Sequence, residues 1–154
     1  MKPKILNQHQ ILRQKISFLS DPSVFPEHPS SINSRETHYS WIFIGDDFVY
    51  KMKKPVLADL LDFSTLERRR HCCDEELRLN RRLAPELYLA VVPVTGNLDQ
   101  ACFGGEGPVL EYAVKMRRFS QHGLLSVSLP DRQTLQRLAR QVAEFHLRIP
   151  AADP

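Results

Sequence analysis

Lys51 is the residue whose position most directly suggests chemistry. It ends the run Phe48–Lys51, in which three strand-forming residues precede the lysine, and in a strand it shares a face with Val49 and Lys53. A lysine on the inner face of a sheet is costly unless a carboxylate pairs with it. A lysine held in this way can bind phosphate groups. The alternative is a solvated lysine at a strand edge, where lysines are common.

Two glutamates in the next helical segment are candidate partners for Lys51. Glu75 and Glu76 lie near the middle of a helical pattern that spans residues 62–83. Glu76 falls on one predicted stripe of this helix, so periodicity favours it, although either glutamate fits. The stripe also contains Cys72, Leu79 and Leu83. The alternative is that both glutamates are solvated and pair with arginines three to seven residues further along the helix, namely Arg78, Arg81 and Arg82.

Hydrophobic periodicity and turn residues predict the elements that position these side chains. The predicted order is a helix over 5–19, a surface linker over 21–36, strands near 39–44 and 48–53 around a Gly45-Asp46-Asp47 turn, a helix over 62–83, strands over 87–94 and 108–119, and a helix over 131–148. Asp62 or Ser64 is expected to cap the central helix, with Glu67 completing a capping box. Strands and helices do not alternate as in parallel sheets. The pattern therefore predicts an α+β fold with a mostly antiparallel sheet, one packed helix and flanking terminal helices.

Composition narrows the classes of function. The 154 residues suit one domain, and 42% apolar with 25% charged residues is typical of globular proteins. The net charge of +3 does not indicate a nucleic-acid partner, and no apolar run is long enough to predict a membrane span. The N-terminal residues lack an apolar signal core, and the three cysteines form no CxxC pair. We therefore expect a cytoplasmic protein without a disulfide framework.

Three long stretches resemble one known family. THYSWIFIGDDFVYKMKKPV, LDFSTLERRRHCCDEELRLNRRLAPELYLAVVPV and EYAVKMRRF are similar to the N-terminal lobe of the bacterial aminoglycoside-phosphotransferase-like family of uncharacterised, protein-kinase-like proteins. The resemblance spans most of the chain, from about residue 20 to residue 148. It implies a kinase-like small lobe over residues 37–119, preceded by a helix and linker over 1–36 and followed by the first helix of a large lobe over 120–154.

The resemblance implies ATP as the cofactor. Lys51 would contact the α- and β-phosphates and pair with Glu75 or Glu76, and the segment 115–119 would be a hinge whose backbone contacts the adenine edge. Met116 would line the adenine pocket, or alternatively belong to the core. The two other hinge residues expected at the nucleotide are Arg117 and Arg118.

The expected phosphate-covering loop departs from the family pattern because it is not rich in glycine. Thr37, His38 and Ser40 stand there and can donate hydrogen bonds to phosphates. The alternative is ordinary turn chemistry. The glycine-dense segment 104–107 lacks a following Lys-Ser or Lys-Thr, so it is not a P-loop.

A second departure concerns catalysis. No aspartate after His146 matches the catalytic and Mg²⁺-binding residues of the family, because the one acid there is Asp153 in a proline-bounded tail. We therefore expect a single incomplete domain with no catalytic residues and no metal site, in which Mg²⁺ would bind only with the missing lobe. It would be the ATP-binding lobe of a phosphotransferase acting on a small-molecule hydroxyl, inactive alone. The alternative is a non-catalytic, pseudokinase-like module that binds a nucleotide or a protein.

Two helix surfaces complete the expectations. The arginine-rich side of the central helix, Arg68–Arg70 with Arg81 and Arg82, is expected to be a solvated face and not a nucleic-acid site. The helix over 131–148 carries an apolar stripe that would fold back, self-associate or stay exposed. That stripe consists of Leu135, Leu138, Val142 and Phe145.

Overall fold

The computed structural model describes residues 16–58, 61–97 and 100–150. The chain divides into two compact units, Met1–Arg118 and Phe119–Pro154. The first unit contains η1 (Pro22–Val24), β1 (Asn33–Glu36), β2 (Ser40–Ile44), β3 (Phe48–Lys53), β4 (Leu57–Ala58), β5 (Leu61–Asp62), α2 (Leu66–Asn80), β6 (Tyr88–Gly96), β7 (Ala101–Phe103) and β8 (Val109–Arg117). The second contains η2 (Gln121–Gly123) and α3 (Arg132–Arg148).

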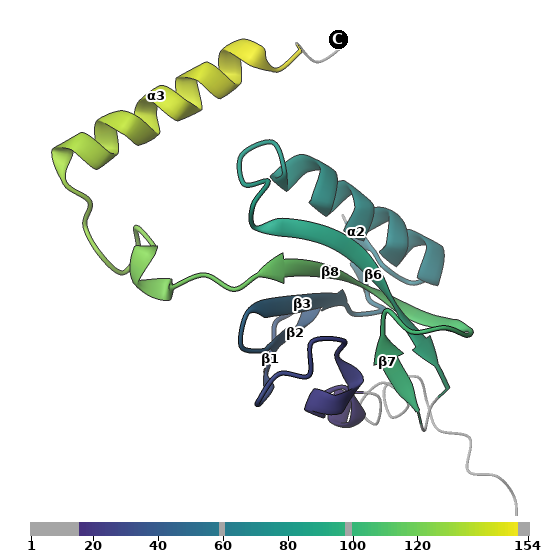
Figure 1. Cartoon of the computed structure of the whole chain (residues 1–154). Helices are drawn as coiled ribbons and strands as arrows, with labels where there is room; N and C mark the ends of the chain where they lie inside the picture. The colour runs from purple at the N-terminus through teal and green to yellow at the C-terminus, as the bar shows by residue number, and fades with distance from the viewer. Residues whose placement is uncertain (1–15, 59–60, 98–99, 151–154) are drawn as a thin grey trace, which may run out of the picture. The chain divides into compact units, whose positions relative to one another are not determined.

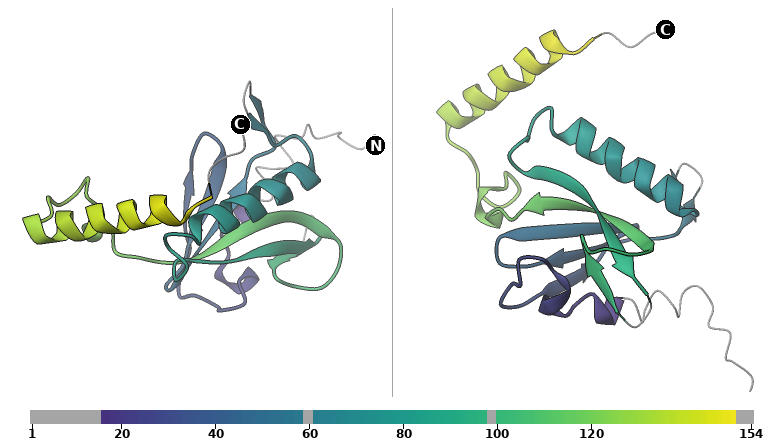
Figure 2. Two further views of the ribbon diagram at one scale, coloured as in Figure 1. Left: turned by 90° about the horizontal axis from the view of Figure 1, so that it is seen from above. Right: turned by 45° about the vertical axis from the view of Figure 1, so that its right-hand side comes forward.

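The first unit is built on a six-stranded antiparallel sheet with the order β1-β2-β3-β8-β6-β7 (Figure 1). The sheet is strongly curled, and α2 covers one of its faces (Figure 2). β4 and β5 form a separate two-stranded hairpin just before α2. This arrangement confirms the predicted α+β class, the mostly antiparallel sheet and the packed helix.

The predicted β2–β3 hairpin is confirmed, and its turn is closed by a bond from the N–H of Gly45 to the carbonyl of Phe48 at 2.9 Å. β6, β8 and α3 also lie where periodicity predicted them, with every boundary within two residues. Asp131 caps α3 through a bond from the N–H of Thr134.

The segment predicted as a surface linker, residues 21–36, is instead part of the fold. It contains η1 and the edge strand β1, and Val24 and Phe25 lie in the core at 6% and 1% exposure. The three prolines and four serines of this segment are typical of a loop, so no sequence pattern indicated that Val24 and Phe25 are buried. The helix predicted over 5–19 lies mostly outside the described residues, although Ile16–Phe18 are helical. The short strands β4, β5 and β7 were not predicted.

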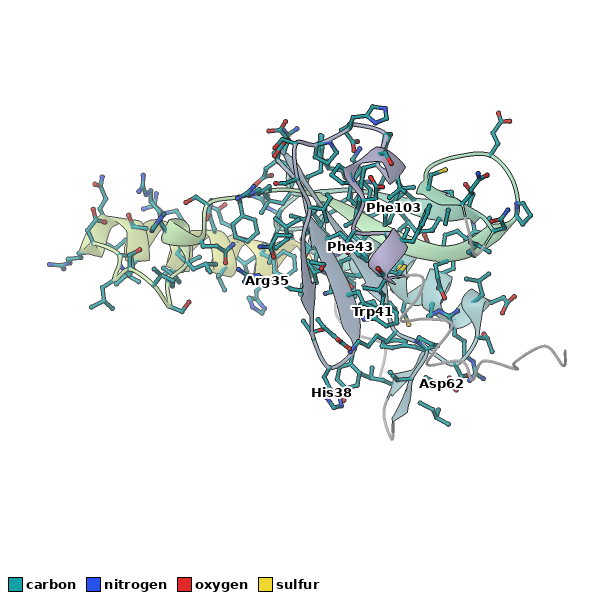
Figure 3. The ribbon with its side chains drawn as sticks, turned by 90° about the horizontal axis from the view of Figure 1, so that it is seen from below. Arg35, His38, Trp41, Phe43, Asp62 and Phe103 are labelled. Carbon is teal, nitrogen blue, oxygen red and sulfur yellow. The ribbon has the colours of Figure 1, made fainter. Side chains whose placement is uncertain are left out.

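The main core lies on the face of the sheet opposite α2. Aromatic rings fill it: Phe25 stacks on Phe103 at 4.6 Å between centroids and meets the ring of Tyr50 edge-on at 5.1 Å. Phe43 and Phe103 lie close together on this side, as Figure 3 shows. The remaining members are Leu19, Val24, Trp41, Met52, Val94, Ala101 and Ala113.

α2 packs on β8 and β6 in a way that periodicity did not predict. Thr65 caps it, not Asp62 or Ser64, and the side chain of Thr65 accepts the N–H of Arg68. The predicted stripe is wrong, since Leu79 and Leu83 are exposed and the buried residues of α2 are Arg69 and Cys73. The prediction of a solvated arginine face therefore fails at Arg69. Apolar side chains are too sparse on this helix to set its inward face.

In the second unit, α3 carries its apolar residues along one side. Leu135, Leu138 and Val142 are exposed, and Phe145 is half-buried. Among the residues that the structure describes, no helix is both long and apolar enough to cross a membrane.

Candidate functional site

One carboxylate joins two lysines between β3 and α2. The Nζ of Lys51 donates to Oε1 of Glu76 at 2.8 Å, and the Nζ of Lys53 donates to Oε2 of the same residue. Alternation along β3 places both lysines on the α2 face of the sheet, as predicted. Glu76 points at them from the middle of the helix. The structure thus brings together the two residues that the sequence singled out.

Glu75 has a different partner, which settles the open choice between the two glutamates. Both of its carboxylate oxygens accept from Arg78, at 2.9 and 2.6 Å, on the exposed side of α2. This is the surface pairing that helix spacing offered as the alternative. Glu75 is therefore directed away from Lys51, and only Glu76 belongs to the site.

The site carries more positive than negative charge. Burial alone raises the pKa of Glu76, but hydrogen bonds from Lys51 and Lys53 outweigh it and hold the pKa below its ordinary value of 4.5. Glu76 is therefore ionised at neutral pH, and two ammonium groups share its single negative charge. One uncompensated positive charge in a partly buried site is favourable for an anion.

The two lysines are not equivalent. The side chain of Lys53 is only 11% exposed, and its Nζ also lies 5.6 Å from the centroid of the Phe63 ring. The side chain of Lys51 is 30% exposed. Lys53 is therefore enclosed by protein, and Lys51 is the cation that a ligand can reach.

Half-buried apolar side chains lie beside Lys51 on the same face. Residues directly opposite on antiparallel strands share a face, so the pairs Ile42–Lys51 and Val49–Met116 place these side chains together. Ile44 pairs with Val49 and joins them. All four apolar members are half-buried. α2 packs mainly on β8 and β6, whereas three of the four lie on β2 and β3. We call Ile42, Ile44, Val49 and Met116 the apolar platform.

Tyr88 stands at the edge of this group. It lies opposite Met116 on β6, and burial together with the charge of Glu76 raises the pKa of its hydroxyl. Tyr88 was not among the predicted site residues. A strand tyrosine between apolar residues has no local signal that separates it from the core.

The segment expected to be a hinge is the end of β8, and its backbone is hydrogen-bonded to neighbouring segments as far as Arg118. The N–H of Arg117 donates to the carbonyl of Leu87 at 2.8 Å, and the N–H of Arg118 donates to that of Asp47 at 2.8 Å. The side chain of Arg118 also bonds the carbonyl of Gly45 at 2.9 Å. These backbone donors are engaged and do not offer themselves to an adenine edge. Met116 is half-buried on the Lys51 face, so it is neither a full core residue nor exposed.

The β1–β2 turn holds the remaining predicted residues. The hydroxyl of Thr37 donates to the carbonyl of Ser40 and accepts its N–H, both at 3.0 Å, which is the turn chemistry offered as the alternative. Ser40 is 2% exposed. His38 lies exposed at the outer end of the turn, as Figure 3 shows, in edge contact with Tyr39. Of these three residues, only His38 extends freely from the loop.

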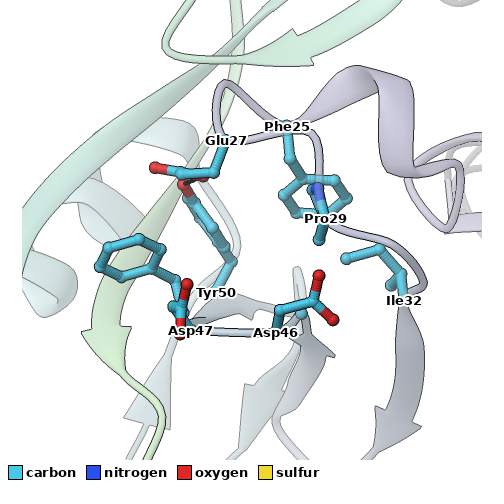
Figure 4. A pocket seen from close by; sticks show the side chains of 9 residues that line it. Phe25, Glu27, Pro29, Ile32, Asp46, Asp47 and Tyr50 are labelled. Carbon is cyan, nitrogen blue, oxygen red and sulfur yellow. Dashed lines mark hydrogen bonds between the residues drawn. The ribbon is translucent and has the colours of Figure 1, made fainter.

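A small pocket lies on the opposite face, between η1 and the β2–β3 turn (Figure 4). Two of the carboxylates that line it have partners: Glu27 accepts from Tyr50 at 2.7 Å and from Lys115, and Asp46 accepts from the N–H and hydroxyl of Ser30. Lys115, expected in the hinge, is thus committed to this face. Lys51 does not line this pocket, and we take the lysine–glutamate cluster as the candidate site.

Comparisons with known proteins give relatives of much greater length. Uncharacterized protein Rv2004c of Mycobacterium tuberculosis is 35% identical to this chain over 121 residues, which cover 76% of this chain and 23% of that protein. Uncharacterized protein Mb2027c of Mycobacterium bovis matches with the same identity and coverage. No protein-family model matches the chain, and no solved structure gives a significant match. The chain therefore spans less than a quarter of the length of these relatives.

Proposed function

We propose that the sheet and α2 form the ATP-binding lobe of a phosphotransferase that acts on a small-molecule hydroxyl. The observation that carries the proposal is the cluster of Lys51, Lys53 and Glu76. In it the partly exposed side chain of Lys51 lies beside the apolar platform. A nucleotide needs both features, a cation for its phosphates and a flat apolar surface for its base.

The two lysines divide the work in this proposal. Lys51 donates to phosphate oxygens, where a charge-assisted hydrogen bond is strong. Lys53, enclosed beside Phe63, keeps Glu76 ionised and in place when Lys51 turns toward the ligand. The purine ring lies against Ile42, Ile44, Val49 and Met116. No step of phosphoryl transfer is assigned to these residues, because they bind and orient the nucleotide.

Acceptor binding and Mg²⁺ binding belong to other segments. Phosphoryl transfer needs an acidic side chain at the acceptor hydroxyl and acidic or amide oxygens on the metal. The candidate site supplies one carboxylate, Glu76, and both of its oxygens are held by lysines. We therefore propose that this chain binds nucleotide without turnover on its own.

The second candidate is a non-catalytic module that binds a nucleotide or a protein. The same pairing of both Glu76 oxygens favours it, since the lysines already hold the carboxylate that the described residues place at Lys51. The two candidates differ in whether a longer form of the protein transfers phosphate. Self-association through α3 stays a separate prediction, which light scattering on this chain checks.

Isothermal calorimetry with Mg-ATP tests the proposal. Wild type should bind, Lys51→Ala should bind about tenfold more weakly or not at all because a phosphate contact is lost, and Arg78→Ala should match wild type. Arg78 is a suitable control because it is an exposed cation on the same helix as Glu76. Absence of binding by a folded wild type would refute the nucleotide assignment. Equal binding by Lys51→Ala would remove the role given to Lys51.

A further inference from the structure

Three residues of α2 face the sheet in a single row. Arg69, Cys73 and Glu76 are spaced i, i+4 and i+7, which places them on one side of two helical turns. Cys73 is fully buried, with its Sγ 3.9 Å from the carbonyl of Tyr112 on β8. The small thiol lies between two charged anchors. The helix is therefore held to the sheet by a buried thiol and by an ionic contact at each end of the row.

The Arg69 anchor uses four of the five N–H donors of its guanidinium group. Its Nε and Nη2 donate to the two carboxylate oxygens of Glu111 on β8, each at 2.8 Å. Its Nη1 donates to the carbonyls of Phe63 and Ser64, at 2.8 and 3.2 Å. The side chains of Arg69 and Glu111 are 8% and 4% exposed. This two-pronged geometry fixes both distance and direction, and burial protects it from competing water.

Ionic docking constrains a helix more than apolar docking does. Apolar contact is not directional, so a helix can slide or rotate on an apolar surface at a small cost in free energy. Leu79 and Leu83 are exposed, and the other leucines of α2, Leu66 and Leu77, are only half-buried, so Cys73 is the one fully buried apolar side chain of this helix. Arg69 and Glu76 are about 10 Å apart along the axis, at about 1.5 Å per residue. A displacement at Arg69 therefore carries over to Glu76.

We propose that Arg69 and Glu111 are positioning residues for the Lys51–Glu76 site. They fix α2 on the sheet so that Glu76 reaches Lys51 before any ligand binds. Neither residue touches the candidate phosphate position, and their effect passes through the helix. The part of this inference that concerns ligand affinity rests on the proposed function; the part that concerns helix position does not.

The test reads the position of Glu76 without a ligand. The pKa of its carboxyl group, followed through the ¹³C chemical shift of the carboxyl carbon, reports its surroundings. The titratable groups that face it are Lys51, Lys53, Cys73 and Tyr88. In Glu111→Gln the pKa of Glu76 should rise toward its ordinary value as the lysine contacts loosen. Removing the negative charge of Glu111 would by itself lower that pKa, so a rise reports displacement of the helix. Glu75→Gln, on the exposed side of α2, should leave the pKa of Glu76 without a rise.

A double variant covers the case in which Glu111→Gln does not fold. Arg69→Met/Glu111→Met leaves no buried charge unpaired, so it should fold, and it should show the same rise in the pKa of Glu76. In both variants the affinity for Mg-ATP should fall about tenfold, as is usual when a supporting partner of a binding residue is lost. A pKa of Glu76 that stays at or below the wild-type value in a folded variant would overturn the proposal. A rise in pKa with no binding of Mg-ATP to wild type would refute the proposed function and leave the positioning role intact.

Discussion

The two faces of the curled sheet are built by different forces. The face toward η1 is packed with aromatic rings, and Phe25, Phe43 and Tyr50 there are at most 2% exposed. The face toward α2 combines buried apolar residues, Cys73 and Val114, with buried and half-buried charges, of which Arg69 and Glu76 anchor the helix. The residues of the apolar platform, on the same face, are only half-buried. The comparison indicates that one face supplies stability and the other supplies a defined geometry next to open space.

This division has a physical basis. Apolar burial is strong and non-directional, so it suits a core in which many arrangements are acceptable. A buried guanidinium–carboxylate pair adds little net stability over a well-packed apolar pair, but removing one partner is very unfavourable. Charged contacts therefore suit a place where position matters.

The aromatic face should give the largest loss of stability. Phe25→Ala should lower the free energy of unfolding by about 4 kcal/mol, because a fully buried ring leaves a cavity in the core. Denaturant titration followed by tryptophan fluorescence measures it, since Trp41 lies in the same core. Phe119→Ala, in an exposed ring of the second unit, is the control. A loss below about 1 kcal/mol for Phe25→Ala would contradict the importance of η1 to the core.

The ionic face should respond to single and double changes differently. Arg69→Met should lower the free energy of unfolding by about 3 kcal/mol, because the buried carboxylate of Glu111 loses its guanidinium partner. Arg69→Met/Glu111→Met should lie within about 1 kcal/mol of wild type, because the charges are removed together. Urea titration of the three proteins measures both values. A double variant as unstable as the single one would show that the pair itself, and not the stranded charge, provides the stability.

Acid should weaken the ionic face at Glu76. Because the pKa of Glu76 is lower in the folded than in the unfolded chain, its contribution to stability is fully present above pH 4.5 and is lost as the pH falls through the folded value. Between about pH 7 and about pH 3, the free energy of unfolding should therefore decrease less for Glu76→Gln than for wild type. Denaturant titrations at a series of pH values measure it. Parallel pH profiles for the two proteins would mean that Glu76 is not held by the lysines in solution.

The adjacent cysteines offer the mildest test of where α2 sits. Burial raises the pKa of the Cys73 thiol to about 12, and its side chain is fully enclosed. Cys72, one residue earlier, is only half-buried. A thiol reagent at pH 8 should modify Cys72 in the folded chain and reach Cys73 only in denaturant, as located by peptide mass spectrometry. Equal rates in the native protein would place α2 in a different rotation on the sheet.

Sequence reasoning succeeded where patterns are local. The β2–β3 hairpin has alternating residues around Gly45-Asp46-Asp47, and Lys51 and Glu76 lie on elements whose period sets their direction. It failed where contacts are distant. Arg69 looked like one of three solvated arginines because its partner, Glu111, is 42 residues away. Phe25 was hidden among prolines and serines, and Lys53 was placed on the correct face without a role, because no local pattern tells that two lysines share one carboxylate.

Protection of Lys51 from an amine-reactive reagent is a direct test of whether Mg-ATP binds at the lysine–glutamate cluster. Of the lysines described by the structure, Lys51 has the most exposed side chain, at 30%, against 11%, 14% and 19% for Lys53, Lys54 and Lys115. Brief acylation followed by mass spectrometry should therefore label Lys51, and saturating Mg-ATP should slow that labelling while leaving Lys115, on the opposite face, unchanged. Labelling of Lys51 at the same rate with and without Mg-ATP would contradict the account.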